Sequence, residues 1–561
     1  MNPGISSSGS RFTSDHLIER NRSRRSLREY FCLTLFVVCG VGKIHAESPV
    51  TVAPVQATSA HEATLFAFDD VSIPFTDNLI LTMHPAQKHP ANPVVALGRR
   101  GEPDEWKVEY CGTVLRQAGK FRMWYIAVSR EGYLHPSSGR DIDFRGWRVA
   151  YAESNDGIHW TKPNLGIEEF RGNRNNNLVG MPAGFRGYDA AVLYESEEAD
   201  PSRRFKMLAL LTKFGEYTLS TAKSAYVPLY SADGLRWRVA EEVLTGNSKV
   251  IAADDLVRME GTGLYKWGGL YHLSGQGAAH APVDIYGRYI QIFQSPDFLH
   301  WSHMPAMAFA RYPQYRRPAK PDPAAEGDAI EQTHLGVTAW NRGNVLLGLT
   351  GMWHGTGDWR TVTHDLGFLI SNDGLHFREP VPDFLFARVG EDGRDWDIGG
   401  LSQGQGFENV GDKTYIWYGQ MDQRQGTFTG QPWKREGGVG LLLLDRDRFG
   451  SLSLRDPNNS AGFITSDLKV SGPVRIALNA DGLSPESSLR VELLDRFQRP
   501  LREYSGSNAA QIQQSGLRVP VRWKRGDQIG ELPELFKIKV SFDGDLRGAI
   551  EFYALYVESV R

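Results

Sequence analysis

A short phrase recurs along the chain and constrains its fold more than any other feature. It reads SNDGIHW from Ser154, SADGLRW from Ser231, SPDFLHW from Ser295 and SNDGLHF from Ser371, and a degraded copy, DRDRFGS, begins at Asp445. The successive intervals are 77, 64, 76 and 74 residues. Self-similarity at a near-constant interval indicates an array of similar structural units.

Each copy has the chemistry of a tight turn, because glycine after aspartate readily adopts the positive φ that a hairpin needs. Every unit also contains an earlier pair of apolar runs, such as EYCGTVL with KFRMWYIAV in the first. Each unit therefore reads as four short strands. Four-stranded units repeated around an axis form a β-propeller, whereas a solenoid needs repeats of about 20 to 45 residues. A stack of sheets in a sandwich is the other alternative. We predict a five-bladed β-propeller over residues 64–455.

The pattern of apolar and polar residues changes after Gly450. The runs SLRVELLD, GLRVPVRW, LFKIKVSF and AIEFYALYVE alternate between apolar and polar positions, and turns such as NADGLSP separate them. This alternation is typical of an antiparallel sandwich. The predicted fold class is therefore all-β, a five-bladed β-propeller followed by a β-sandwich over residues 456–561.

The N-terminus has the pattern of a secretory signal. Five arginines in RNRSRRSLR precede a 12-residue apolar run, FCLTLFVVCGVG, and a small residue follows at Ala46. The run is too short to span a bilayer as a helix. We predict a signal peptide over residues 1–46, a linker over 47–63, and a secreted or periplasmic protein. A buried N-terminal helix is the alternative.

The mature chain is mildly acidic and nearly free of cysteine. Its net charge is −7, because the signal removes seven Lys and Arg and three Asp and Glu from a chain of charge −3. A net negative charge does not favour binding to nucleic acid. No other apolar run is long enough to anchor the mature chain in a membrane. Only Cys111 remains after cleavage, which excludes an intrachain disulfide and a cysteine metal cluster.

Carboxylates precede or begin the first strand of every predicted blade. In chain order they are Glu109, Asp189, Asp254 with Asp255, Asp328 with Glu331, and Asp395 with Asp397. Radial geometry brings the starts of these strands to one end of the central channel. Like charges held together shift one another's pKa values, and in this way a general acid and a base or nucleophile arise near neutral pH. Glycoside hydrolysis needs such a pair.

Other uses of these acids remain open. Each one alone is compatible with a solvated strand end or an ion pair with arginine. A structural calcium ion is a further alternative, which does not exclude catalysis, because hard cations prefer several carboxylate oxygens. His272, His280 and His354 match no zinc motif by spacing. No nucleotide-binding fingerprint is present, so no cofactor and no catalytic metal are predicted.

Aromatic and amide side chains near the same strands suit a sugar. We predict that His272, Trp353 and His354 follow the second strands of the third and fourth blades, and that Gln403 lies in the first strand of the fifth. Aromatic faces pack against sugar C–H groups, while amides and imidazoles bond hydroxyls. Each of these residues is also compatible with ordinary packing.

Several segments resemble one family. YAESNDGIHWTKPNLGIEEFRGNRNNNLV (Tyr151–Val179), DLGFLISNDGLHFREP (Asp365–Pro380) and QGQGFENVGDKTYIWYG (Gln403–Gly419) are similar to exported bacterial proteins grouped with glycoside hydrolase family 32. The C-terminal LRVELLD and VRWKRGD are similar to that group's terminal sandwich. The resemblance runs from about Leu65 to the end. It implies the five-bladed propeller that families 32, 43, 68 and 130 share, and it implies glycosidase activity.

The chain departs from the catalytic motifs of those families. The Asn-Asp-Pro-Asn-Gly run of invertases is absent, and the one RDP triplet, Arg455–Pro457, follows the propeller. Roles are therefore assigned from strand position. We predict Glu331 as the general acid, Asp189 as the base or nucleophile, and Asp254 or Asp255 as the modulator. The predicted substrate contacts are Glu109, His272, Asp328, Trp353, His354, Asp397 and Gln403.

Three functions follow from these patterns. The leading one is a glycoside hydrolase that cleaves a poly- or oligosaccharide with a carboxylate pair. The second is a non-catalytic carbohydrate-binding propeller, which predicts fewer than two carboxylates within about 10 Å of each other at the channel mouth. The third is a cell-surface interaction protein, which predicts an exposed apolar patch. The sequence does not indicate an oligomeric state.

Overall fold

The computed structural model describes residues 62–130, 147–182, 190–212, 224–252, 260–277, 288–311, 331–355, 358–425, 429, 431–432, 434–470 and 472–560. These residues belong to one compact unit, 53–561. Among them, no helix is long and apolar enough to cross a membrane. The predicted signal peptide and most of the predicted linker lie outside the described residues.

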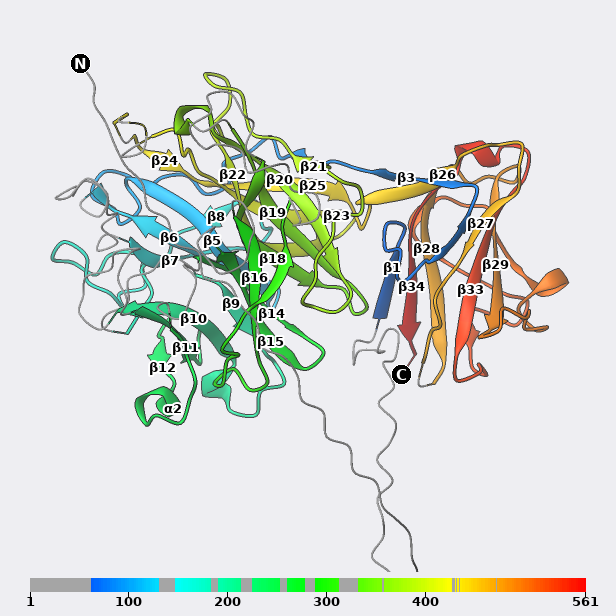
Figure 1. The fold of residues 1–561 in the computed structure, drawn as a ribbon, viewed down its shortest axis with the longest axis horizontal. Helices are drawn as coiled ribbons and strands as arrows, with labels where there is room; N and C mark the ends of the chain where they lie inside the picture. Colours follow the sequence, from blue (N-terminus) through cyan, green and yellow to red (C-terminus); the bar gives the residue numbers. More distant parts are fainter. Residues whose placement is uncertain are drawn as a thin grey trace, which may run out of the picture. The chain divides into compact units, whose positions relative to one another are not determined.

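Five four-stranded antiparallel units follow one another along the chain, as predicted (Figure 1). Their strands are β5 (Lys107–Gln117), β6 (Lys120–Val128), β7 (Trp147–Ser154) and β8 (Trp160–Thr161) in blade 1; β9 (Val192–Tyr194), β10 (Phe205–Thr212), β11 (Ser224–Ser231) and β12 (Arg238–Val239) in blade 2; β14 (Glu260–Trp267), β15 (Leu270–Gly277), β16 (Tyr289–Ser295) and β17 (Ala306–Phe309) in blade 3; β18 (Gln332–Asn341), β19 (Leu346–His354), β20 (Thr363–Ser371) and β21 (Leu385–Ala387) in blade 4; and β22 (Leu401–Val410), β23 (Lys413–Gln420), β25 (Val439–Asp445) and β4 (Gln87–Lys88) in blade 5. Two short strands are added to these units, β13 (Ile251–Ala252) beside β11 and β24 (Glu436–Gly437) beside β5. A single helical turn, α2 (Glu241–Leu244), follows β12.

The first strands of the blades are the inner strands β5, β9, β14, β18 and β22. Each contacts the next in this order, and β22 also contacts β5, with which it shares a parallel bridge. We call the end at which these strands begin the entry end, and the opposite end the far end. The inner strands of blades 3 and 4 approach so closely that a Cβ on Gly263 would lie 2.2 Å from the carbonyl oxygen of Val337. Glycine is therefore required at that contact.

The recurring phrase forms the turn between the third and fourth strands of a blade. Ser154 Oγ accepts a hydrogen bond from the Gly157 amide at 2.9 Å, and Asp156 Oδ1 accepts from two later amides. Gly157 has a φ of +79°, as the turn prediction requires. In the third copy Phe298 replaces the glycine and still adopts a φ of +70°. The aromatic residue that follows packs inward, and Trp301 of the third copy is buried.

The sandwich consists of two sheets, but its boundaries differ from the expected 456–561. The strands of one sheet are β3 (Leu79–Met83), β26 (Gly450–Leu454), β34 (Glu551–Ser559), β28 (Val474–Asp481), β31 (Gly516–Pro520), β1 (Glu62–Phe66) and β32 (Gln528–Ile529). Those of the other are β2 (Phe75–Asp77), β27 (Ala461–Ile464), β33 (Phe536–Asp543), β29 (Ser488–Asp495) and β30 (Ala510–Ile512). The segment from β1 to β3 precedes the blades in sequence yet pairs with the C-terminal strands (Figure 1).

The fifth copy of the phrase explains the same boundary. It follows β25, but the chain then enters β26 in the sandwich, and β4 supplies the fourth strand of blade 5. The assignment of residues 64–86 and 450–455 to the propeller is therefore corrected. Pairing between segments so far apart in the sequence leaves no local pattern by which it could be predicted.

Candidate functional site

Four of the predicted site residues lie outside the described residues: Asp189, Asp254, Asp255 and Asp328. Nothing in the structure tests the roles predicted for them. The other predicted residues are described, and most of them lie at the entry end.

An irregularity recurs at the entry end of the inner strands. The pairing register shifts after Glu109 in β5, after Gly261 in β14, after His334 in β18 and after Gln403 in β22. β-Bulges re-aim side chains and are frequent beside active sites. In β18 the bulge places Leu335 at a φ of +61°, a region that costs a non-glycine residue about 1 to 3 kcal/mol. The irregularities thus fall next to two of the predicted residues, Glu109 and Gln403.

Glu109 belongs to a buried group of three charges. The ammonium group of Lys107, two residues earlier on β5, lies 2.7 Å from Glu109 Oε2 and 3.3 Å from Glu436 Oε1. The two carboxylate oxygens are therefore no more than about 6 Å apart. All three residues are buried, and β24 pairs Glu436 with Lys107 in parallel. We call Lys107, Glu109 and Glu436 the lysine-bridged pair.

The electrostatics of Glu436 favour its neutral form. Burial is the largest cause, and the charges of Asp422 and Glu109 add to it, so the pKa of Glu436 is raised despite the attraction of Lys107. Its other oxygen, Oε2, accepts hydrogen bonds from the side chain of Gln425 at 3.0 Å and from the Asp422 amide at 3.3 Å. Glu436 is thus held on both oxygens.

Two imidazoles and an indole stack in blade 4. The ring centroids of His334 and His364 lie 4.1 Å apart, and those of Trp353 and His364 lie 4.7 Å apart. The guanidinium group of Arg288 lies 4.3 Å from the Trp353 ring centroid. Burial holds the pKa values of both histidines well below their ordinary range, and the charge of Arg288 lowers both further. The two imidazoles are therefore neutral.

Several polar atoms of this stack have no hydrogen-bond partner among the described residues. They are Nδ1 of His334 and both ring nitrogens of His364. Neutral imidazole has one donor and one acceptor, the same pair of functions that a sugar hydroxyl or a water molecule offers in return. Buried polar atoms without partners are uncommon and need an explanation such as water or a ligand. The charge of Lys107 also acts on His334, so the lysine-bridged pair and this stack are neighbours.

Gln403 braces the bulge of β18. Its amide nitrogen donates to the carbonyl oxygens of His334 at 2.9 Å and Gly336 at 2.7 Å. The amide oxygen of Gln403 has no partner among the residues that the structure describes. Gln276 acts on the same bulge, since its side-chain oxygen accepts from the Leu335 amide at 2.8 Å. The side-chain nitrogen of Gln403 thus stabilises the β18 bulge, and its amide oxygen stays compatible with the predicted substrate contact.

Glu331 and His354 are brought together, as their prediction for one site requires. His354 Nδ1 lies 2.7 Å from Glu331 Oε2, and His354 Nε2 lies 3.2 Å from Asp365 Oδ2. Burial lowers the pKa of His354, but the hydrogen bonds and charges of Asp365 and Glu331 outweigh it and raise that pKa to about 9. Arg311 also binds Glu331 Oε2. At neutral pH both partners of Glu331 are therefore cations.

Asp397 and His272 are not brought to these groups. Asp397 is buried between Lys88 Nζ at 2.6 Å and the hydroxyl of Tyr418, which donates to it at 2.8 Å, so it links the outer strand β4 to β23 within blade 5. His272 lies near the start of β15, opposite Tyr265, at the far end of blade 3. Its ring stacks on Tyr265 at 4.9 Å, and burial lowers its pKa to about 4.

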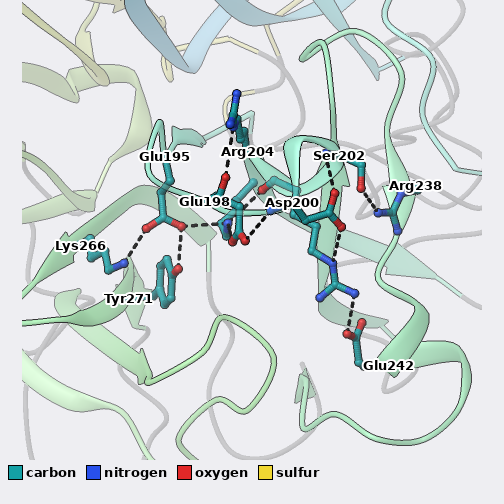
Figure 2. A network of polar contacts seen from close by, with 11 residues as sticks. Glu195, Glu198, Asp200, Ser202, Arg204, Arg238, Glu242, Lys266 and Tyr271 are labelled. Carbon is teal, nitrogen blue, oxygen red and sulfur yellow. Dashed lines mark hydrogen bonds and ion pairs between the residues drawn. The ribbon is translucent and has the colours of Figure 1, made fainter.

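A second lysine-bridged arrangement lies at the far end, between blades 2 and 3 (Figure 2). Lys206 lies 2.8 Å from both Glu195 and Glu198, and Glu195 also binds Lys266 and the hydroxyl of Tyr271, both at 2.6 Å. Here hydrogen bonds to the cations outweigh burial, and the pKa values of Glu195 and Glu198 are lowered. We call Glu195, Glu198, Lys206, Lys266 and Tyr271 the far-end network.

The sequence did not single out Lys107, Glu436, His334, His364 or Arg288. Lys107 and His334 had a signal, because each stands within three residues of a predicted acid on an inner strand. Glu436 had none, since it follows the second strand of blade 5 and reaches the site through pairing with blade 1. Among the described residues no group of three or more histidine, cysteine or acidic side chains is arranged to hold a metal ion.

No protein-family model matches the chain, and no curated protein matches it. Among solved structures it is similar to one described for the GH130 family of mannoside phosphorylases, which contains glycoside hydrolases that target β-1,2 mannosidic linkages in Candida mannan (15% identity, TM-score 0.40, 65% of this chain and 95% of that chain). It is also similar to a β-1,2-mannobiose phosphorylase from Listeria innocua (14%, 0.38, 64% and 97%) and to an N-acetylgalactosamine deacetylase from F. plautii (12%, 0.37, 65% and 96%). Similarity at this level assigns neither a family nor an activity to the chain.

Proposed function

We propose that the chain is a glycosidase that cleaves a poly- or oligosaccharide at the entry end of the inner strands. The observation that carries this proposal is the lysine-bridged pair, in which two buried carboxylates lie within about 6 Å beside a bulge. Glycosidases act through paired carboxyl groups, and Glu109 and Glu436 support the proposal because they gather such groups at the entry end; the acid and base roles are assigned below to other residues. The neighbouring stack of Trp353 with two neutral imidazoles suits the apolar face and the hydroxyls of a sugar.

The carboxylate pair also bears on the second function considered from the sequence. A binding-only propeller predicts fewer than two carboxylates within about 10 Å of each other at the channel mouth. Glu109 and Glu436 are closer than this, and we take the pair as support for the enzyme, although both side chains are buried. Export to the periplasm or the medium stays part of the proposal and rests on the N-terminal pattern alone.

We retain the catalytic roles predicted from strand position. Glu331 is the proposed general acid, Asp189 the base or nucleophile, and Asp254 or Asp255 the modulator. Arg311 and His354 both contact Glu331 as ion-pair partners. Glu109, Trp353, His354 and Gln403 are the proposed substrate contacts among the described residues. His272 and Asp397 are not included, because their neighbours belong to other parts of the blades.

The test is release of reducing ends from a panel of plant and algal polysaccharides and their oligomers. Wild type is compared with Glu331→Gln and Asp189→Asn, and Glu198→Gln in the far-end network is the matched control. We expect kcat to fall by about 10² to 10⁴ in the first two variants, the usual contribution of general acid–base catalysis. The control is expected to keep its kcat. Full activity in both Glu331→Gln and Asp189→Asn would refute the assigned roles.

A further inference from the structure

His354 lies between two carboxylates that come from different parts of blade 4. Its Nδ1 lies 2.7 Å from Oε2 of Glu331, the residue before β18, and its Nε2 lies 3.2 Å from Oδ2 of Asp365 on β20. The first contact is a hydrogen bond and the second is an ion pair. One imidazole thus joins two acidic side chains, and each of its nitrogens has a carboxylate of its own.

Three further contacts between aspartate and histidine among the described residues are of a different kind. They join Asp156 to His159, Asp297 to His300 and Asp373 to His376, each at 2.7 Å. Each of these pairs spans three residues within one copy of the recurring phrase, and its side chains are exposed. Such pairs follow from the local turn. The partners of His354 are instead brought to it by the pairing of β19 with β18 and β20.

The two carboxylates differ in how firmly they are held. The side chain of Asp365 is 11% exposed, whereas that of Glu331 is 25% exposed. Asp365 Oδ1 accepts a hydrogen bond from the Val389 amide at 2.7 Å, so each of its oxygens has a partner. The contacts therefore lead from a buried carboxylate that is fixed to the backbone, through the imidazole, to the more exposed carboxylate of Glu331.

We propose that Asp365 is a positioning residue for Glu331, and that it acts by holding the imidazole of His354 with Nδ1 toward the Glu331 carboxylate. An imidazole that meets a reacting side chain with one nitrogen and is oriented by a carboxylate at the other is a recurrent arrangement in enzymes. The inference rests on the proposed function, which makes Glu331 the general acid. It adds Asp365, on the third strand of the blade, which was not predicted as a site residue.

The charged groups around His354 determine what the loss of Asp365 does. Among the described residues, Asp365 and Glu331 are the anions that face the imidazole, and Arg311 reaches Glu331 as a second cation. His364 of β20 is also near, and burial keeps it neutral. An anion beside an imidazole favours the charged form of the ring. Loss of the Asp365 charge is therefore expected to favour neutral His354 and to weaken its attraction to Glu331.

The first experiment needs no substrate. The chain is prepared with isotope-labelled histidine, the His354 signals are identified by their loss in His354→Gln, and the imidazole is titrated by NMR from pH 5 to 10. In wild type the pKa of His354 is expected near its raised value of about 9. In Asp365→Asn we expect that pKa to be lower by at least about one unit, because an anion that favours the charged ring is gone.

Asparagine at position 365 keeps an oxygen that can accept from the Val389 amide, so the fold is expected to persist. The matched control is Asp373→Asn, which removes the charge from the exposed pair with His376 in the same blade. It is expected to leave the titration of His354 unchanged. An unmoved His354 titration in Asp365→Asn would overturn the inference.

The second experiment is a double-mutant cycle on a substrate identified in the panel, with kcat and KM measured for wild type, Asp365→Asn, His354→Gln and the double variant. Asp365→Asn alone is expected to lower kcat about tenfold and to keep KM within about twofold of wild type. Added to His354→Gln, the same substitution is expected to cost less than about twofold, because the residue through which it acts is already absent. Asp373→Asn is expected to keep the wild-type kcat. Equal losses in both backgrounds would show that Asp365 only supports the fold, and would overturn the positioning role.

The two experiments separate the failures. If Asp365→Asn moves the His354 titration but wild type cleaves no glycan, the proposed function fails while the hold of Asp365 on His354 stands. If glycans are cleaved and either the titration is unmoved or the losses are equal in both backgrounds, this inference fails while the proposed function stands.

Discussion

Replacing His354 by glutamine removes a cation that stabilises the fold only below a defined pH. The pKa of His354 is raised to about 9 in the folded chain, chiefly through Asp365 and Glu331, against an ordinary value of 6.5. Because the folded pKa is the higher one, the stabilisation is fully present below pH 6.5 and is lost as pH rises through 9. The difference between the two pKa values corresponds to about 3 kcal/mol at pH 6 and to less than about 0.5 kcal/mol at pH 9.

The assay is urea unfolding, followed by tryptophan fluorescence, of wild type and His354→Gln between pH 5.5 and 9.5. We expect the difference in unfolding free energy to shrink by about 2 to 3 kcal/mol across this range. His272→Gln is the control of opposite sign, because burial lowers the pKa of His272 to about 4. Its difference is expected to be constant above pH 6.5 and to change only as pH falls toward 4. A pH-independent difference for His354→Gln would refute the bridge between Glu331 and Asp365.

Two further predictions concern the scaffold. Arg342→Met is expected to lower the unfolding free energy by about 3 to 5 kcal/mol, because it leaves the buried carboxylate of Asp447 without its cation. Adding Asp447→Asn should recover part of this loss in urea unfolding, and a larger loss in the double variant would contradict the reasoning. Gly112→Ala is expected to lower Tm sharply, because its Cβ would lie 1.9 Å from the Trp124 carbonyl oxygen. An unchanged Tm would show that the β5 bulge accommodates a Cβ at position 112, contrary to this prediction.

The blades were predictable because their signals are local. The recurring phrase carries its own turn chemistry, and in the first copy Ser154, Asp156 and Gly157 make the bonds that a tight turn needs. The sandwich was only half predictable. Its C-terminal strands alternate visibly, but β1 and β3 pair with strands more than 350 residues away. Pairing at such a separation depends on the tertiary fold and not on neighbouring residues.

The contacts of the candidate site were only partly predictable. Strand position placed Glu331 and His354 at one end of the blades, and the structure brings these two side chains into contact; their predicted roles stay predictions. It missed Glu436, which has no strand pattern of its own and lies beside Lys107 through the parallel pairing of β24 with β5. It also assigned His272 to the site, because His272 was predicted to follow the second strand of blade 3, whereas it lies near the start of that strand, β15. In an antiparallel pair the second strand begins at the far end.

A crystal structure of Glu331→Gln with a bound oligosaccharide substrate tests the central claim most directly. The account predicts a sugar at the entry end, with one of its hydroxyls or its glycosidic oxygen within hydrogen-bond distance of Glu109 and a ring packed near Trp353. A saccharide bound only on the sandwich, or at the far end beside the Glu195 and Lys206 pair, would contradict it.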